Sequence, residues 1–367
     1  MEELPASAAS AAPAAIPGVP AADAPGMLSP GSCTVLVLGA RGRLGYACVQ
    51  AFAQSGWRVL ARVRAGSALA DHSDHTLAAG GVRWIDTPLT DDAAWQELLD
   101  QHGPINVVVH AMAPQFTYRA WQQELADLNR ASAAIAKKAG ALLIVPVSVL
   151  RYGTQLPEVI YEDQPLPNVS NVDTPMGKLR AQTEWDIRCA AESGVQVCTL
   201  RVGTLYGDTG DRWLNGAVAK DLPQGKMAWL GPYEVATPWG YMPDLAQTME
   251  RIATQRHQLG GWTQLNFAGM QRTGYDWQKA LSITAQQRGW LQSGELQASQ
   301  LYWNLWKPVG WVSARIRALH QLEYVWRTPH RMDNRRLLSL IGVEPRTDWQ
   351  TSVHHTIDRL FPATETA

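Results

Sequence analysis

The fold is decided by the stretch VLVLGARGRLG, which spans residues Val35–Gly45. Four aliphatic residues run into three glycines, and a helix-forming segment follows. Gly39 permits a tight turn, Gly42 lets the backbone approach a pyrophosphate, and Gly45 lets the helix pack close to the strand. The N-terminus of that helix offers N–H groups and a positive dipole end to phosphates. Between a strand and a helix, this spacing predicts a dinucleotide-binding loop.

Short aliphatic runs alternate with longer helical stretches after this loop. Each run carries Val, Leu or Ile on successive residues, as strands do when both of their faces are covered. Repeated strand–helix–strand units at this spacing predict an α/β fold with a Rossmann-like, doubly wound parallel sheet. The expected strands are residues 34–38, 58–62, 106–110, 141–147 and 195–201, and the expected helices are residues 43–55, 93–102, 120–138 and 176–193.

The composition changes along the chain and predicts three regions. Residues 1–31 consist almost entirely of Ala, Pro, Gly and Ser, so we expect a disordered tail, with Met27 as a candidate start. Residues 32–202 form the expected NAD(P)-binding Rossmann domain. Gly and Pro cluster beyond it, so residues 203–367 are expected to form a smaller C-terminal substrate lobe, packed intimately on the first domain. One further strand is expected at residues 264–267.

The charge balance and the cysteines exclude several classes of protein. The chain has 367 residues, of which 32 are Lys or Arg and 33 are Asp or Glu, for a net charge of −1. A binder of nucleic acid or of anionic membranes needs a basic surplus, so we expect neither partner. No apolar run approaches the ~20 residues that cross a bilayer. The four cysteines form no Cys-x-x-Cys pair, which favours a cytoplasmic protein, and no metal site is indicated.

The charges around the second expected strand indicate which dinucleotide binds. A site for NAD usually places Asp or Glu about 20 residues after the glycines, where it holds the ribose 2′-hydroxyl. No acid occurs between Gly45 and Asp71. Instead, Arg58, Arg62 and Arg64 lie around this strand, and Arg41 and Arg43 lie in the glycine loop. These arginines favour a 2′-phosphate, and hence NADP(H) over NAD(H), although a solvated basic patch is the alternative.

Several later segments follow the glycine loop in a fixed order. They are Val107–Ala113, Asn129, Val147–Gly153, Leu200–Gly207 and Tyr241–Ala246. Together with the glycine spacing, over about residues 33–361, they resemble the extended short-chain dehydrogenase/reductase family. That family includes nucleotide-sugar epimerases, dehydratases and dTDP-4-dehydrorhamnose reductases.

The resemblance implies a cofactor site, a substrate class and an assembly. It implies a small-molecule substrate, either a nucleotide sugar or a similar metabolite with a carbonyl or hydroxyl group. It also implies a homodimer paired through helices, and it places Ser148 in the position of the catalytic serine. Besides the glycines and arginines already named, the implied cofactor contacts are Leu44, His110, Ala111, Met112, Arg180 and Val202.

The catalytic motif of the family, Tyr-x-x-x-Lys, is absent from its expected place. In the family the Tyr phenol exchanges a proton with the substrate, while the Lys lowers the Tyr pKa and binds the nicotinamide ribose. One register of the stretch TPMGKLR puts Met176 and Arg180 at these two positions. A shift by two residues puts Thr174 and Lys178 there instead. Neither register contains a phenol, and neither a thioether nor a Thr hydroxyl replaces it as an acid near neutral pH.

Three accounts of the function follow from this departure. The chain is an oxidoreductase with a relocated proton donor, a sensor that binds NADP(H) without turnover, or a scaffold on a borrowed fold. We favour the first account, and the second and third remain the alternatives. The candidate catalytic residues are Ser148, Arg180, Lys178 and Tyr152, and the other candidate proton donors are Tyr206, Tyr161, His110 and Asp173.

Overall fold

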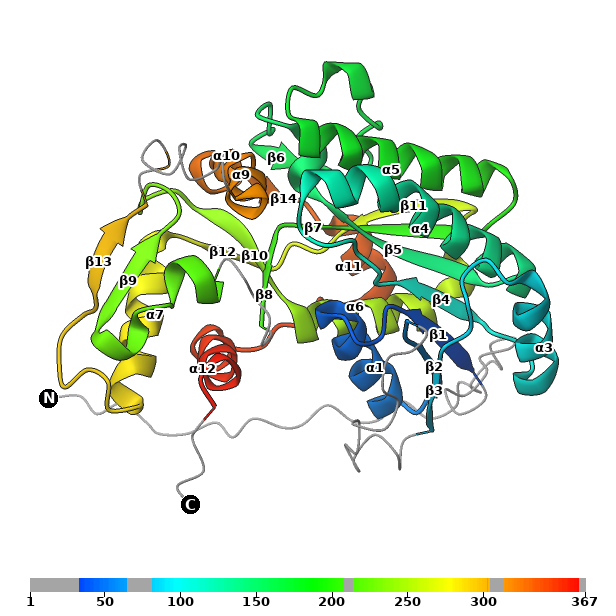
Figure 1. Ribbon diagram of the computed structural model, residues 1–367, viewed down its shortest axis with the longest axis horizontal. Helices are drawn as coiled ribbons and strands as arrows, with labels where there is room; N and C mark the ends of the chain where they lie inside the picture. Colours follow the sequence, from blue (N-terminus) through cyan, green and yellow to red (C-terminus); the bar gives the residue numbers. More distant parts are fainter. Residues whose placement is uncertain (1–32, 65–80, 208–213, 302, 304–312, 363–367) are drawn as a thin grey trace, which may run out of the picture.

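The computed structural model describes residues 33–64, 81–207, 214–301, 303 and 313–362. The expected tail, with Met27, lies outside these residues. Figure 1 shows a larger lobe, in which helices cover both faces of a sheet, beside a smaller lobe of short strands and helices. The two lobes are the frame in which the glycine loop and the later motifs are placed.

The larger lobe is built on seven strands in the order β11-β7-β5-β4-β1-β2-β3. Every neighbouring pair is parallel. The order reverses at β1, so the carboxyl ends of β1, β2 and β4 meet at the switch point where open α/β sheets bind ligands. The predicted Rossmann-like, doubly wound sheet is confirmed. Its strands are β1 Thr34–Leu38, β2 Arg58–Arg62, β3 Val82–Ile85, β4 Val107–His110, β5 Leu142–Ser148, β7 Val197–Val202 and β11 Trp262–Asn266.

Two helical layers cover this sheet, and the period of the strands assigns side chains to each. In β1, Val35 and Val37 join the core under α1 and α6, whereas Leu36 and Leu38 join the core under α3, α4 and α5. Since both faces are covered, all five residues of β1 are buried, as its unbroken aliphatic run requires. The helices are α1 Arg43–Gln54, α3 Asp92–His102, α4 Tyr118–Ala139, α5 Pro175–Glu192 and α6 Met242–Thr254.

The helix N-termini of this lobe are satisfied in different ways. Asp91 caps α3, Thr117 caps α4 and Thr174 caps α5, each accepting a backbone N–H with its side-chain oxygen. Gly42 is the N-cap of helix α1 and has no side chain to cap it, and the first turn of the helix carries no acidic residue. Gly42 therefore offers no side-chain acceptor to the first N–H groups of α1, which lie at the sheet's switch point.

The smaller lobe packs around an aromatic core. Trp277 contacts Tyr206, Trp239 and Trp349 edge to face, with ring centroids 4.8–5.2 Å apart. Its strands are β6 Val159–Ile160, β8 Thr204–Tyr206, β9 Lys226–Trp229, β10 Thr237–Tyr241, β12 Met270–Arg272, β13 Gln297–Gln300 and β14 Arg331–Met332. The remaining helices and helical turns are η2 Val149–Tyr152, η3 Val169–Asn171, η4 Leu214–Val218, η5 Leu222–Gln224, η6 Arg256–Gln258, α7 Gly274–Gln287, α9 Ala314–His320, α10 Glu323–Arg327, α11 Arg335–Ile341 and α12 Trp349–Leu360. Of these, η6 and α11 lie against the larger lobe.

The chain passes between the two lobes more than once after residue 203. Helix α6 packs on α1, β11 adds an edge strand beside β7, and α11 contacts both α6 and β11. The Glu162 carboxylate accepts backbone N–H groups from Asn266 (3.0 Å), Arg336 (2.6 Å) and Leu337 (3.0 Å). The Glu344 carboxylate accepts those of Ala268 and its neighbour in the same way. Residues of the expected C-terminal lobe thus contribute to both lobes.

No helix in the described part of the chain is both long and apolar enough to cross a membrane.

The close packing of the glycine loop makes Gly45 intolerant of a side chain. A Cβ on Gly45 would lie 2.1 Å from the Gly39 carbonyl oxygen, which is backbone and has no rotamer to change. We expect Gly45→Ala to lower the free energy of unfolding by about 1–3 kcal/mol, as overpacking does. Urea unfolding followed by Trp fluorescence measures this. Gly261→Ala is the control, since its Cβ would meet nothing within 4 Å; equal stabilities of the two variants would contradict the packing argument.

Candidate functional site

The glycine loop joins β1 to α1 and leaves one of its glycines open to the outside. Gly39 has a φ of +85°, and a Cβ there would lie 2.8 Å from the Ala111 carbonyl oxygen. Gly42 donates its N–H to the Gly39 carbonyl at 2.8 Å. Gly42 itself is exposed, and a Cβ on it would meet only the Gly39 oxygen at 3.0 Å and the Ala111 oxygen at 3.6 Å. The protein's own packing requires Gly39 and Gly45, whereas Gly42 faces the space where a ligand would approach.

The first turn of α1 completes an anion-binding geometry. The N-cap Gly42 gives the N–H groups of this turn no side-chain acceptor, and the helix dipole adds a positive partial charge at this end. Arg41 and Arg43 are exposed on either side of Gly42, and Leu44 is half-buried behind them. These features suit a diphosphate.

Arg62 lies at the carboxyl end of β2, beside the glycine loop. It pairs with Leu38 in the sheet register, and its carbonyl accepts the Ala40 N–H at 3.0 Å. The Arg62 side chain is buried, and its Nε donates to the Thr87 carbonyl at 3.0 Å. Burial is the main cause that lowers the Arg62 pKa, and the neighbouring cation of Arg64 adds to it.

Two charged residues, Arg64 and Asp86, affect the pKa of Arg62, and the sequence indicates only the first of them. Arg64 follows Arg62 and is exposed. Asp86, directly after β3, opposes the lowering of the Arg62 pKa. Asp86 has no clear signal in the sequence, because β3 has only four residues, is partly exposed and lacks the aliphatic run of a buried strand. The end of β2 therefore carries two arginines, and among the described residues the acid that acts on Arg62 is Asp86, which follows β3.

His110 ends β4 and is held as a neutral ring. The Ser132 hydroxyl donates to the Leu128 carbonyl at 2.8 Å, so it accepts from His110 Nδ1 at 2.6 Å. This leaves Nε2 as the unprotonated nitrogen. Burial, followed by the charge of Arg180, lowers the His110 pKa to about 4. His110 is therefore a hydrogen-bond acceptor at neutral pH, beside the half-buried Ala111 and Met112.

Ser148 ends β5, and its hydroxyl accepts the Leu150 N–H at 3.3 Å, which caps η2. In the sheet it pairs with the buried Val202 of β7. Tyr152, at the end of η2, is half-buried, and its phenol donates to Gln164 at 2.7 Å. Ser148 retains its own proton for donation to a further acceptor.

Helix α5 orients the two registers of the departed motif differently. Met176 is fully buried, and the Arg180 guanidinium stacks on the Trp121 ring of α4, 4.0 Å from its centroid. Thr174 uses its hydroxyl to cap the helix at Gly177, and Lys178 is exposed. The pair of Met176 and Arg180 thus faces the interior.

The remaining candidate proton donors are held by other parts of the chain. The Tyr206 phenol lies in the aromatic core, 2.8 Å from the Ser352 hydroxyl, and burial raises its pKa. Tyr161 is exposed. Asp173 accepts two hydrogen bonds from Thr154, which lower its pKa and keep it a carboxylate at neutral pH. Tyr206 is enclosed in the aromatic core and Asp173 is a carboxylate, so neither is suited to give a proton to a substrate.

One phenol near this region comes from a distant segment. Tyr324 of α10 is buried, and its hydroxyl donates to the Leu150 carbonyl at 3.1 Å. Burial is the main cause that raises its pKa, and a hydrogen bond to Thr174 opposes this. The sequence offers no signal for this contact, since it joins residues 174 positions apart.

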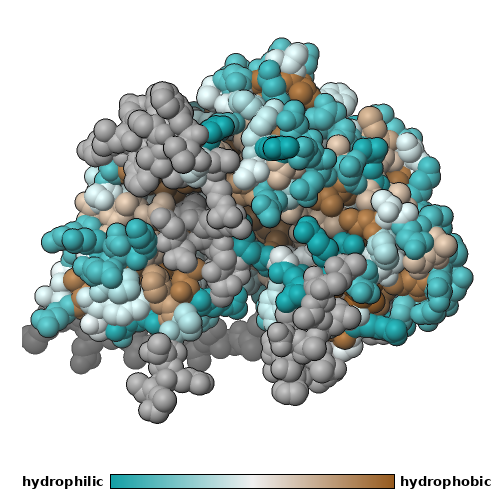
Figure 2. All heavy atoms as spheres, viewed as in Figure 1, coloured by the Kyte–Doolittle hydropathy of each residue, from teal (hydrophilic) through white to brown (hydrophobic). Residues whose placement is uncertain are grey.

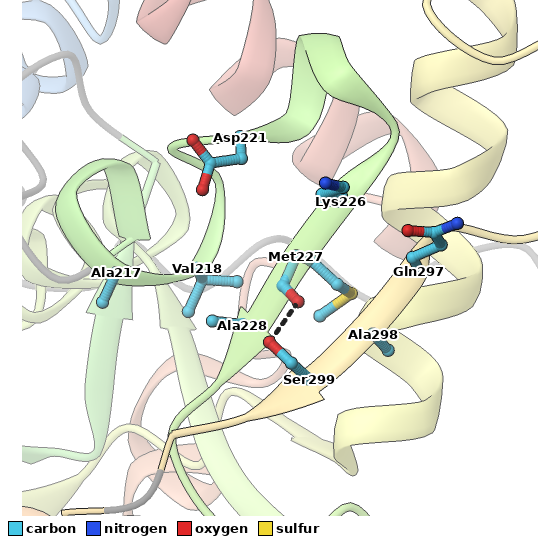
Figure 3. A pocket seen from close by; sticks show the side chains of 9 residues that line it. All are labelled: Ala217, Val218, Asp221, Lys226, Met227, Ala228, Gln297, Ala298 and Ser299. Atoms are coloured by element: carbon cyan, nitrogen blue, oxygen red, sulfur yellow. Dashed lines mark hydrogen bonds between the residues drawn. The ribbon is translucent and has the colours of Figure 1, made fainter. Parts of the chain in front are cut away.

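A cavity of about 310 Å³ lies in the smaller lobe, between η4 and the strands β9 and β13 (Figure 3). The Ser299 hydroxyl crosses between the two strands and donates to the Met227 carbonyl at 3.2 Å. Figure 3 shows the ends of Asp221, Lys226 and Gln297 around its rim. The cavity belongs to the C-terminal lobe and includes none of the candidate site residues. The lining residues are Ala217, Val218, Asp221, Lys226, Met227, Ala228, Gln297, Ala298 and Ser299.

An apolar surface patch or a metal site would be two further kinds of functional site in the described residues. Hydrophobic and hydrophilic residues are intermixed over the visible face of the larger lobe (Figure 2). Within the described ranges, no three His, Cys, Asp or Glu side chains gather as a metal site would require.

Neutral His110 makes stability depend on pH. Its folded pKa of about 4 lies below the ordinary 6.5, so the unfolded chain binds more protons between these values, and stability falls as pH drops through them. From pH 7.5 to 5.0 we expect wild type to lose about 2 kcal/mol more than His110→Gln, which lacks the titrating ring. Urea unfolding at the two pH values measures the difference. Parallel losses in both proteins would show that His110 is not held neutral.

Comparisons with known proteins agree with this geometry. The model of the NAD dependent epimerase/dehydratase family matches residues 35–266. No curated protein is similar enough in sequence to be a relative.

Solved structures share the fold at low sequence identity. The UDP-Glc/GlcNAc 4-epimerase of Campylobacter jejuni is 13% identical, with a TM-score of 0.66 over 90% of this chain and 99% of that chain. The enzyme WbmH of Bordetella bronchiseptica, solved with NAD+, is 16% identical, with a TM-score of 0.65 over 90% and 99%. The UDP-N-acetylglucosamine 4-epimerase of Bacillus cereus is 15% identical, with a TM-score of 0.62 over 92% and 99%. With more than half of the sequence matched by the family model, the chain belongs to the NAD-dependent epimerase/dehydratase family, a group of extended short-chain dehydrogenases/reductases.

Proposed function

We propose that this chain binds NADP(H) and acts as an oxidoreductase on a nucleotide sugar or a similar metabolite with a carbonyl or hydroxyl group. The observation that carries the proposal is the open Gly42 at the uncapped N-terminus of α1, with Arg62 and Arg64 at the end of β2. An acid about 20 residues after the glycines would favour NAD, and the sequence has none between Gly45 and Asp71. The substrate class is supported by the Campylobacter jejuni neighbour, which is a UDP-Glc/GlcNAc 4-epimerase.

The residues of the larger lobe fit the parts of this cofactor in order. The pyrophosphate would lie on Gly42 and the first N–H groups of α1. Arg64 and Arg62, with Arg41 and Arg43 of the loop, would hold the 2′-phosphate. The nicotinamide half would lie beyond β1, near Ala111, Met112 and Val202. When bound, the cofactor would give or take a hydride.

The chain's own residues would position the substrate oxygen and the ribose. Ser148, at the end of β5, has a hydroxyl proton to donate to the reacting oxygen. Arg180 faces inward, which supports a role on the nicotinamide side of the site, whereas Lys178 is exposed. Tyr152 is half-buried at the end of η2, four residues after Ser148, and we propose its phenol as the proton donor. A cytoplasmic location and a homodimer paired through helices belong to the same proposal.

The alternative is a protein that binds NADP(H) without turnover. The observation that favours it is Met176, which is fully buried at the position where the family carries its catalytic phenol. A buried thioether neither gives nor takes a proton. In this alternative the chain senses the cofactor, or serves as a scaffold, instead of reducing a substrate.

Removal of Arg64 should reverse the preference between the two cofactors. We expect wild type to bind NADPH at micromolar concentration and NADH more weakly. In Arg64→Ser we expect the affinity for NADPH to fall about tenfold or more, because a charge-assisted hydrogen bond is lost, while the affinity for NADH changes little. Quenching of Trp fluorescence measures both. Lys137→Ser, an exposed cation on α4, should bind as wild type does. Equal binding of NADPH by Arg64→Ser and wild type would refute the 2′-phosphate assignment.

A substrate screen with the Ser148→Ala variant distinguishes an enzyme from a sensor that binds NADP(H) without turnover. With NADPH bound, a panel of nucleotide-linked keto sugars is screened for NADPH oxidation at 340 nm. We expect Ser148→Ala to lower kcat about 100-fold on any substrate found, since the proton-sharing hydroxyl is lost. Ser339→Ala, an exposed serine of α11, should retain full turnover. Undiminished kcat in Ser148→Ala would remove Ser148 from the mechanism, and a panel with no turnover would favour the sensor.

A further inference from the structure

Three guanidinium groups gather around one carboxylate beneath the inner face of α5. Arg151 Nη1 contacts Glu184 Oε2, and Arg201 Nη2 lies 3.7 Å from the same oxygen. The side chains of Arg151, Glu184 and Arg201 are each at most 1% exposed. Arg180 stands one turn before Glu184 on the same helix, and the Glu184 charge acts to raise its pKa. One negative charge thus faces three positive charges.

The other partners of the two buried arginines are neutral. Arg151 donates to the Pro165 carbonyl, and Arg201 donates to the side-chain oxygens of Asn266 and Gln264. The next buried acid, Glu162, is bound to three backbone N–H groups at the start of α11 and at β11. The described residues around Glu184 therefore hold an excess of positive charge, which is costly to bury unless it is paired.

Arg180 is the member of this group with no hydrogen bond to the described residues. Its Nε is buried without an acceptor, and its guanidinium is supported only by stacking on Trp121. Burial lowers its pKa to about 10, so it stays a cation at neutral pH. The side chain keeps some exposed surface, and its charge lowers the pKa of His110. Among the described residues, no acceptor is recorded for the Arg180 guanidinium, which carries a full positive charge.

The position of Arg180 decides which anion would pair with it. Its charge acts on His110 at the end of β4, and β4 lies on the opposite side of β1 from β2, which carries Arg62 at its end. In the proposed function Arg62 and Arg64 hold the 2′-phosphate, and the N-terminus of α1 holds the pyrophosphate. A ribose hydroxyl near Arg180 is neutral and would leave its charge uncompensated. The missing negative charge would therefore belong to the substrate.

We propose that Arg180 binds an anionic group of the substrate, a carboxylate or a phosphate, beside the nicotinamide half of the cofactor site. This inference rests on the proposed function for the placement of the cofactor. It narrows the substrate class to metabolites that carry an acidic group close to the reacting carbonyl or hydroxyl. The planar guanidinium matches the two oxygens of such a group in a bidentate contact.

Calorimetric titration with oxalate and with inorganic phosphate tests this, at constant ionic strength set with NaCl. Each anion is added to the full chain, with and without saturating NADP+. We expect wild type with NADP+ to bind at least one of them, and Arg180→Gln to bind it about tenfold more weakly or worse. Arg180→Lys, which keeps the charge but not the fork, should bind with intermediate affinity. Arg130→Gln, an exposed arginine of α4, should match wild type.

The outcomes separate this inference from the proposed function. Absence of anion binding by wild type, or equal binding by Arg180→Gln, overturns the inference even where NADP+ binds normally. Loss of wild-type anion binding when NADP+ is added also overturns it, because Arg180 would then hold a cofactor phosphate. Anion binding that depends on Arg180 in a chain that does not bind NADP+ supports the inference and refutes the proposed function. Thermal unfolding verifies that Arg180→Gln is folded, and Arg180→Lys with wild type decides the question if it is not.

Discussion

The contact between the Gly39 carbonyl and the backbone of Gly45 is the constraint on which the rest of the site depends. It brings the first turn of α1 directly against the end of β1, at a distance that only hydrogen fits. Because β1 is the central strand of the switch point, this one approach aims the N–H groups of α1 between the ends of β2 and β4. Arg62 and Arg64 at the end of β2 lie on one side of these N–H groups, and His110 and Ser148 at the ends of β4 and β5 lie on the other.

The elements of the larger lobe are predictable because they obey local rules. Buried parallel strands must be apolar on successive residues, and the glycine loop must have its three glycines, so the sheet and α1 appear directly in the sequence. Strand β3 does not, since an edge strand with two half-exposed residues and one exposed one carries no such run. Asp86 could not be predicted for the same reason, because its effect on Arg62 depends on its position directly after β3.

The candidate site is less predictable because its contacts join distant segments. Thr174 with Lys178 and Met176 with Arg180 have the same spacing, and only the packing of α5 against α4 decides which pair faces inward. The gathering of arginines around Glu184 combines residues from η2, α5 and β7, and no periodicity relates them. The sequence indicates Arg180 as a candidate contact. The excess of positive charge around it depends on the fold, because Arg151, Glu184 and Arg201 come from different elements.

The repeated passage of the chain between the lobes also limits how the molecule can move. Two domains that are joined by one or two flexible linkers can rotate about a hinge. Here β11, α6 and α11 belong to the larger lobe although they follow the start of the smaller one, and Glu162 and Glu344 bind the backbone at these passages. Opening of the lobes as rigid bodies would break several of these buried hydrogen bonds together. Entry and exit of a ligand would therefore depend on movements of loops and short helices at the edge of the sheet.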